Sequence, residues 1–264
     1  MEIYDQHVHT EFSVDSEAPY VSYLQALKKM GKTTFVTTEH IDFDKLVSHT
    51  DEIPDFERQR EFIEMAKKPP YEMKALQGIE LSYRPSTAER LSEFLKKEPL
   101  DLVILAVHES DEEEVSSPQF AKGKTKNEAY HAYLLLCEYA VEHFDDYDTF
   151  AHIDFHLRYL KNLEDIDIQS HKETLTRIFS HIIKKGKSLE CNTRFIYRHH
   201  DMECLEYTLA LYKECGGERI TLGSDCHTVA DFRSGFPEAI AMLKKIGFES
   251  ITQYENRIGH AVKI

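Results

Sequence analysis

Short apolar runs alternate with longer amphipathic segments along the whole chain, and this alternation constrains the fold more than any other feature. Seven runs have the length and composition of strands, and a segment with helical periodicity follows each of them. Strands that alternate with helices form a parallel sheet with the helices outside it. The predicted strands are residues 2–9, 33–40, 73–81, 100–110, 148–155, 187–193 and 219–227.

The segments between these strands have apolar positions at helical spacing, and some of them end at glycine. The predicted helices are residues 20–31, 54–68, 87–97, 127–144, 170–186, 202–217 and 236–248. No linker or repeat interrupts the series, and 264 residues suit one α/β barrel. We therefore predict a single domain over residues 1–264, of the α/β class, folded as a closed or nearly closed barrel. The polar stretch 111–125 is predicted to be a loop and a candidate lid.

Every predicted strand ends in side chains that can bind a metal or a polar ligand. These residues are His7 and His9, His40, Glu80, His108, His152, Glu190 with Asn192, and Asp225 with His227. The C-terminal ends of the strands in a barrel converge on one face, where active sites of this architecture lie. Side chains two positions apart on a strand point the same way, so His7 and His9 should project together. Cys226 should instead point toward the helices.

Each of these residues, taken singly, also fits an ordinary structural role. A lone histidine at a strand end, such as His40 or His152, is more often a hydrogen-bonded structural group than a ligand. Glu80 alone fits a loop carboxylate, Asp225 alone fits a helix N-cap, and Glu190 fits equally a carboxylate that orients a neighbour. As a set, however, several buried histidines and carboxylates without a cation would be costly. Divalent metal ions remove that cost, so the sequence predicts a metal site.

Composition narrows the class of partner. The net charge of −15 argues against a nucleic-acid or anionic-membrane partner, because both require basic surface. No apolar run approaches the roughly 20 residues that span a bilayer. The five cysteines are an odd number without CxxC spacing, as expected of reduced thiols in a cytosol. We therefore expect a cytoplasmic protein with a small-molecule partner; the sequence does not predict its oligomeric state.

Six short motifs resemble the signature of the PHP family, which is named for its polymerase and histidinol-phosphatase members. The motifs are DQHVHTEFSVDS (5–16), TTEH (37–40), GIE (78–80), VH (107–108), AHID (151–154) and GSDCH (223–227). They follow the order of the family and span the chain from end to end. The stretch LECNT (189–193) is similar to the corresponding stretch of histidinol-phosphate phosphatases, so the chain most resembles the stand-alone phosphatases of this family.

The resemblance implies a distorted (β/α)7 barrel, similar to a TIM barrel, that holds three divalent metal ions. Their identity varies in the family among Zn, Mn and Fe. The implied ligands are His7, His9, Glu80 and Asp225 for the first ion, a shared Glu80 with His108 and His152 for the second, and Asp15, His40 and His227 for the third. Asp15 stands where some family members carry histidine, and a hard oxygen ligand there either favours Mn or Fe over Zn or loosens the third site.

The implied activity is hydrolysis of L-histidinol phosphate to L-histidinol and phosphate, a step of histidine biosynthesis. The mechanism implied is in-line attack by a hydroxide that bridges two of the metal ions. The predicted catalytic residues are Asp225, Glu80 and Arg158. Arg158 and Arg194 follow predicted strands and are predicted to bind the phosphate, because arginine forms bidentate phosphate contacts. Asp42 and Glu109, on loops at the same end, are predicted to bind the cationic histidinol group.

Three alternatives stay open on the sequence alone. The protein could hydrolyse another small phosphomonoester, act as a PHP-type phosphodiesterase or nuclease, or bind metal without catalysis. The acidic net charge and the absence of a basic stripe disfavour a nuclease. The intact ligand residues in all six motifs disfavour a non-catalytic domain.

Overall fold

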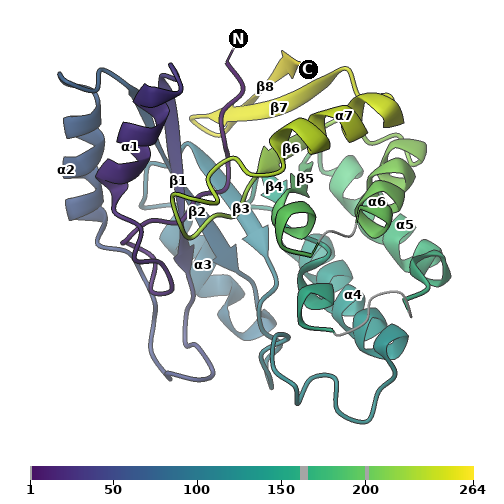
Figure 1. Ribbon diagram of the computed structural model, residues 1–264. Helices are drawn as coiled ribbons and strands as arrows, with labels where there is room; N and C mark the ends of the chain where they lie inside the picture. Colours follow the sequence, from purple (N-terminus) through teal and green to yellow (C-terminus); the bar gives the residue numbers. More distant parts are fainter. Residues whose placement is uncertain (1, 161–165, 200–201) are drawn as a thin grey trace.

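A curled sheet of six parallel strands forms the centre of the protein (Figure 1). The computed structural model describes residues 2–160, 166–199 and 202–264. The strands are β1 (Thr34–Ile41), β2 (Lys74–Ser82), β3 (Leu102–Ala106), β4 (Thr149–Phe150), β5 (Ser188–Asn192) and β6 (Ile220–Gly223). Their order in the sheet is their order in the chain. The predicted α/β class and the barrel-like curvature are thereby confirmed.

Helices connect the strands and cover the outside of the sheet (Figure 1). They are α1 (Tyr20–Lys29), α2 (Phe56–Ala66), α3 (Ala88–Leu95), α4 (Lys126–His143), α5 (Lys172–Lys184), α6 (Glu203–Glu214) and α7 (Phe236–Ile246). Helix α4 begins with a capping box, in which Thr125 Oγ1 accepts from the Glu128 N–H at 3.2 Å and the Glu128 carboxylate accepts from the Thr125 N–H at 2.7 Å. Within the described ranges, no helix is both long enough and apolar enough to cross a bilayer.

Strand β3 is buried on both faces, as its continuous apolar sequence predicts. Alternate side chains point to opposite sides. Val103 and Leu105 belong to the large core between the sheet and the helices. Leu102 and Ile104 point into the barrel, where they meet Tyr254.

The prediction of a regular first strand over residues 2–9 is wrong. The segment lies between β6 and β1 and is hydrogen-bonded to both, but only Val8 forms a β-bridge, and that bridge is isolated. The Gln6 N–H donates to the Leu222 carbonyl of β6 at 3.1 Å. The Thr38 N–H of β1 donates to the Val8 carbonyl at 2.8 Å. The segment therefore takes the place of a seventh strand and closes the gap between the first and last strands of the sheet.

Side chains replace part of the backbone ladder along this segment. The Val8 N–H donates to Thr38 Oγ1 at 2.9 Å instead of to a carbonyl. The buried Asp5 carboxylate accepts from the His7 N–H at 3.2 Å and from the Ser224 N–H at 2.9 Å. These bonds attach the segment to its neighbours, but they do not produce a regular strand.

A C-terminal hairpin, β7 (Ser250–Glu255) and β8 (Ile258–Lys263), was not predicted. It closes the end of the barrel where the strands begin. There the Tyr254 N–H donates to Gln6 Oε1 at 3.0 Å, and the Tyr254 hydroxyl donates to the Asp148 carbonyl at 3.0 Å. The turn carries left-handed φ angles of 50° at Asn256 and 61° at Arg257. A turn of this kind usually contains glycine, so its sequence gives no hairpin signal.

Candidate metal centre

All nine predicted metal ligands converge at the C-terminal end of the sheet. Their ligand atoms form four overlapping groups, and within each group the atoms lie within 4.8 Å of one another. The groups are His9, Asp15, His40 and His227; His7, His152 and Asp225; His7, His9 and Glu80; and His40, Glu80 and His108. Residues more than 200 positions apart in the chain therefore share one site, because the first segment and β6 are neighbours.

Of the four ligands implied for the first ion, His7, His9 and Glu80 form one of these groups, and Asp225 is grouped with His7 and His152 instead. His7 Nε2 and His9 Nε2 are 3.1 Å apart. Glu80 Oε2 lies 3.3 Å from the first nitrogen and 3.4 Å from the second, and Asp225 Oδ1 lies 3.9 and 3.6 Å from them. Ligands at about 2.0–2.1 Å in a tetrahedron around one ion are about 3.3 Å apart. The donor set therefore fits a divalent metal.

Unpaired buried atoms support the same fit. Glu80 is 1 % exposed, and among the described residues its Oε2 has no hydrogen-bond partner. His40 Nδ1, at 3.1 Å from that oxygen, also has none. Buried polar atoms are rarely left without a partner, and a cation bound between them would satisfy both.

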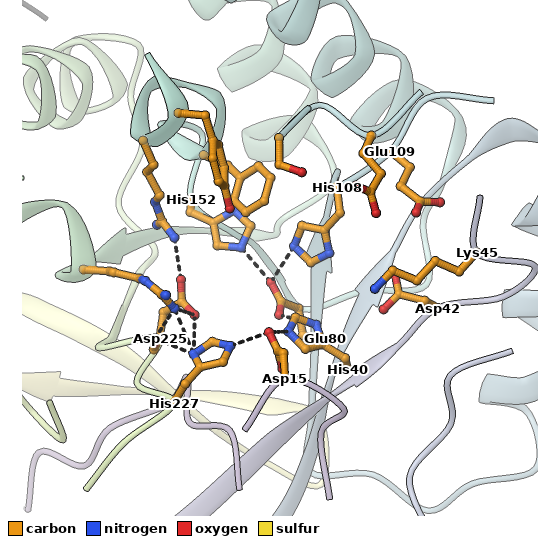
Figure 2. A pocket seen from close by; sticks show the side chains of 16 residues that line it. Asp15, His40, Asp42, Lys45, Glu80, His108, Glu109, His152, Asp225 and His227 are labelled. Atoms are coloured by element: carbon orange, nitrogen blue, oxygen red, sulfur yellow. Dashed lines mark hydrogen bonds and ion pairs between the residues drawn. The ribbon is translucent and has the colours of Figure 1, made fainter. Parts of the chain in front are cut away.

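Glu80 faces two of the groups at once. Its Oε1 lies 2.6 Å from His152 Nε2 and 3.3 Å from His108 Nε2 (Figure 2). Its Oε2 faces His7 and His9. This orientation agrees with the bridging position that the family resemblance implies for Glu80.

The group around Asp15 lies at the outer edge of the centre. Asp15 Oδ2 is 2.9 Å from His227 Nε2 and 3.4 Å from His40 Nε2, and the Asp15 side chain is 50 % exposed. The His9 ring packs against both of the other imidazoles, with centroid distances of 4.2 Å to His40 and 4.3 Å to His227, which are themselves 5.9 Å apart. Solvent can therefore reach this group more easily than the first.

Positive neighbours keep the buried carboxylates ionised. Burial raises the pKa of Asp225, but Arg194, His7 and Arg158 outweigh it and hold the pKa well below the usual range. Burial likewise raises the pKa of Glu80, and the surrounding imidazoles, His7 first, lower it well below its usual value. Ionised carboxylates are the form that binds metal ions.

The two arginines predicted to bind phosphate stand beside Asp225. Arg158 Nη1 donates to Asp225 Oδ2 at 2.6 Å, and its Nε donates to Asp154 Oδ2 at 3.1 Å. Its Nη2 is buried and has no partner among the described residues. Arg194 Nη1 donates to Asp225 Oδ1 at 3.2 Å and lies 2.8 Å from His227 Nδ1. Both arginines line the same pocket.

That pocket has a cavity volume of about 210 Å³, so it is a small, confined site. Asp42 and Glu109 line it on the side away from Asp225 (Figure 2). Glu114, which forms a β-bridge with Glu109, also lines the pocket, and we call these three residues the acidic wall. Lys45 also lies there, but its ammonium is paired with Glu52 at 2.8 Å.

Glu109 is the most constrained member of the acidic wall. It is 3 % exposed, and its Oε1 has no hydrogen-bond partner among the described residues. Its Oε2 accepts a long bond of 3.4 Å from the Leu46 N–H and lies 3.6 Å from Arg84 Nη1. Burial raises the pKa of Glu109, and Arg84 opposes that shift. The carboxylate therefore has a free oxygen on a pocket-lining residue.

Several supporting residues lie behind the ligands. Glu190 Oε1 accepts from His7 Nδ1 at 2.7 Å, which is the orienting role weighed for it from the sequence. Ser13 and Glu39 contact one another behind His9 and were not predicted. The only signal for them in the sequence is that both lie inside motifs that carry ligands. Cys226 points away from the centre, as predicted, and its Sγ contacts the Tyr23 hydroxyl at 3.6 Å.

The candidate lid, residues 111–125, is anchored to the barrel. Val115 and Phe120 are buried. The Val115 N–H donates to the His108 carbonyl at 2.9 Å, and His156 Nδ1 donates to the Val115 carbonyl at 2.7 Å. The loop thus shapes one side of the pocket.

Fold and site together define a metal-binding α/β barrel protein. The model of the PHP domain matches residues 5–194, most of the chain. The chain therefore belongs to the PHP domain family.

Similar proteins cover nearly the whole chain. The histidinol-phosphatase of Lactococcus lactis is 28% identical over 253 residues, covering 95% of this chain and 93% of that protein. The probable histidinol-phosphatase of Thermotoga maritima is 25% identical over 245 residues, covering 93% of each. The crystal structure of the histidinol phosphate phosphatase from Lactococcus lactis, complexed with zinc, L-histidinol and phosphate, superimposes with a TM-score of 0.87 at 28% identity and covers 98% of both chains.

Proposed function

We propose that this protein is a metal-dependent phosphomonoesterase that hydrolyses L-histidinol phosphate to L-histidinol and phosphate. The observation that carries the proposal is the charge polarity of one pocket. Metal ligands with Arg158 and Arg194 line one side, and the acidic wall lines the other. A substrate with a phosphate at one end and a cationic group at the other matches both sides. The Lactococcus relative with L-histidinol and phosphate bound supports the same assignment.

Three divalent ions of Zn, Mn or Fe are the proposed cofactors. The proposed ligands are His7, His9, Glu80 and Asp225 for one ion, Glu80, His108 and His152 for a second, and Asp15, His40 and His227 for the third. When bound, such ions supply Lewis acidity and lower the pKa of water. The buried carboxylates, held ionised by their neighbours, keep the ions in place.

The arginines bind the phosphoryl group. The unpaired Nη2 of Arg158 is a donor for a phosphate oxygen. Arg194, just after β5, is held beside Asp225 by a bond to its carbonyl at 2.9 Å. Their positive charge stabilises the negative charge on the phosphoryl oxygens in the transition state. Arg158 therefore acts catalytically as well as in binding.

The acidic wall binds the cationic part of the substrate. The free oxygen of Glu109 accepts a hydrogen bond from the ammonium or the protonated imidazole of histidinol phosphate. Asp42, which is also buried, adds a second negative charge. A sugar phosphate offers no cation to this wall and binds less well.

The test is phosphate release by the full chain after the metal is stripped and replaced with Zn, Mn or Fe. The substrates are L-histidinol phosphate, a panel of sugar phosphates and single-stranded DNA. The proposal expects the highest kcat/KM for L-histidinol phosphate with at least one metal. A preference for sugar phosphates, cleavage of DNA in place of monoesters, or metal binding without any phosphate release would contradict it.

A further inference from the structure

A hydrogen-bonded relay lies directly behind His9, on the side away from the metal ligands. His9 is fully buried, and its Nδ1 is 3.1 Å from Ser13 Oγ. Ser13 Oγ donates to Glu39 Oε2 at 2.6 Å. Glu39, which is also fully buried, accepts further bonds from Thr10, at 3.0 Å from its N–H and at 2.6 Å from its hydroxyl. The relay joins the N-terminal segment to β1.

Counting protons along this relay fixes the protonation of the imidazole. A serine hydroxyl has one proton to donate and two lone pairs that accept, and a carboxylate only accepts. The Ser13 hydroxyl therefore donates its hydrogen bond to the Glu39 carboxylate. One lone pair accepts the backbone N–H of His40 at 3.2 Å. The other must accept from His9 Nδ1, so His9 carries its proton on Nδ1.

This tautomer is the one that can bind a metal ion through Nε2. With the proton on Nδ1, His9 presents the Nε2 lone pair to His7 Nε2 at 3.1 Å and to Glu80 Oε2 at 3.4 Å. His7 is fixed the same way, because Glu190 accepts from its Nδ1. In the absence of an ion, the Glu80 carboxylate is an acceptor that favours a proton on His9 Nε2. The relay opposes that preference.

We propose that Ser13, held by Glu39, is a positioning residue that selects the metal-binding tautomer of His9. Neither side chain is among the metal ligands, and neither is needed to contact substrate. Groups behind metal-bound histidines commonly set the tautomer and the ring orientation, and their loss costs about 10–100-fold in metal affinity. The inference rests on the proposed metal centre but is independent of which phosphomonoester the protein hydrolyses.

The main test is Ser13→Ala in the full-length protein. Long-range ¹H–¹⁵N spectra of the metal-free, histidine-labelled protein report the tautomer, and loss of signals in His9→Asn assigns His9 among the 15 histidines. We expect Nδ1–H in the wild type and Nε2–H in Ser13→Ala. Zinc competition with a chelator should show about 10–100-fold weaker binding at the site that includes His9.

Two further variants separate this role from general destabilisation. Ser188→Ala is the matched control, because Ser188 is buried like Ser13 and its hydroxyl bonds Tyr254 at 2.8 Å, at the opposite end of the barrel. Ser188→Ala should change neither the tautomer of His9 nor the affinity for zinc. Glu39→Gln should keep the tautomer, since the Thr10 N–H requires the amide oxygen at the Oε2 position, where it still accepts from Ser13.

Three results would overturn the proposal. The first is a Ser13→Ala protein that keeps Nδ1–H and wild-type zinc affinity. The second is an equal loss of affinity in Ser188→Ala. The third is a change of tautomer in Glu39→Gln, which would contradict the proton count.

Discussion

Replacing Glu109 by glutamine should weaken the selection of cationic substrates. The change is isosteric, and the amide oxygen can keep the 3.4 Å bond from the Leu46 N–H. The other oxygen, which has no partner in the described part of the chain, becomes an amide NH₂. The pocket then presents a donor where the wild type presents a carboxylate oxygen to the substrate cation.

The expected loss of kcat/KM follows from the single hydrogen bond to the substrate cation that is removed. A hydrogen bond between charged groups contributes about 1.5–3 kcal/mol, and about 1.4 kcal/mol is a factor of ten. The kcat/KM for L-histidinol phosphate should therefore fall about 10–150-fold. Glycerol phosphate carries no cation, so its kcat/KM should change less than about twofold. Phosphate release at pH 8 with each substrate measures both.

Glu112→Gln is the control, because this residue is exposed on the loop that carries Glu109 and Glu114. It removes the same charge from the chain without touching the buried carboxylate. Equal losses for both substrates in Glu109→Gln, or a matching loss of selectivity in Glu112→Gln, would refute the argument that Glu109 recognises a substrate cation.

Three further predictions follow from the metal centre. His9→Ala and Asp225→Ala should each abolish phosphate release while circular dichroism stays native, and full activity in either would remove that residue from the site. Arg158→Ala should raise the KM for the phosphoester about 10–150-fold, because one hydrogen bond between charged groups is lost. The metal content, measured by mass spectrometry, should stay unchanged, and wild-type kinetics would exclude a phosphate contact. Zinc at about 1,000 times its dissociation constant should stabilise the metal-free protein by about 4 kcal/mol and raise its Tm by roughly 8–16 °C, and an unchanged Tm would show that no folded-state site exists.

Most of the fold could be predicted because its signals are local. Helix α4, for example, has buried apolar side chains at helical spacing, among them Tyr130, Leu134 and Val141. The two errors have a common cause. The hydrogen bonding of residues 2–9 depends on the Thr38 and Asp5 side chains. The hairpin turn depends on the left-handed backbone conformation of Asn256 and Arg257. Neither arrangement leaves a pattern of hydrophobicity or glycine in the sequence.

The convergence of the ligands could be predicted from topology, because the ends of parallel strands must meet on one face. The hydrogen-bond geometry around them could not. The free oxygen of Glu109 depends on which partners Arg84 and Leu46 find. The tautomer of His9 depends on one proton of Ser13. Both follow from side-chain positions that a motif does not specify.

Anomalous diffraction at the zinc edge, from crystals of the full chain grown with excess zinc, tests the central claim most directly. We predict anomalous peaks at the C-terminal end of the sheet, bounded by His7, Glu80, His152 and Asp225, with a further peak beside Asp15. Saturating zinc with no peak within ligand distance of these side chains would contradict the claim that they jointly hold a cluster of cations.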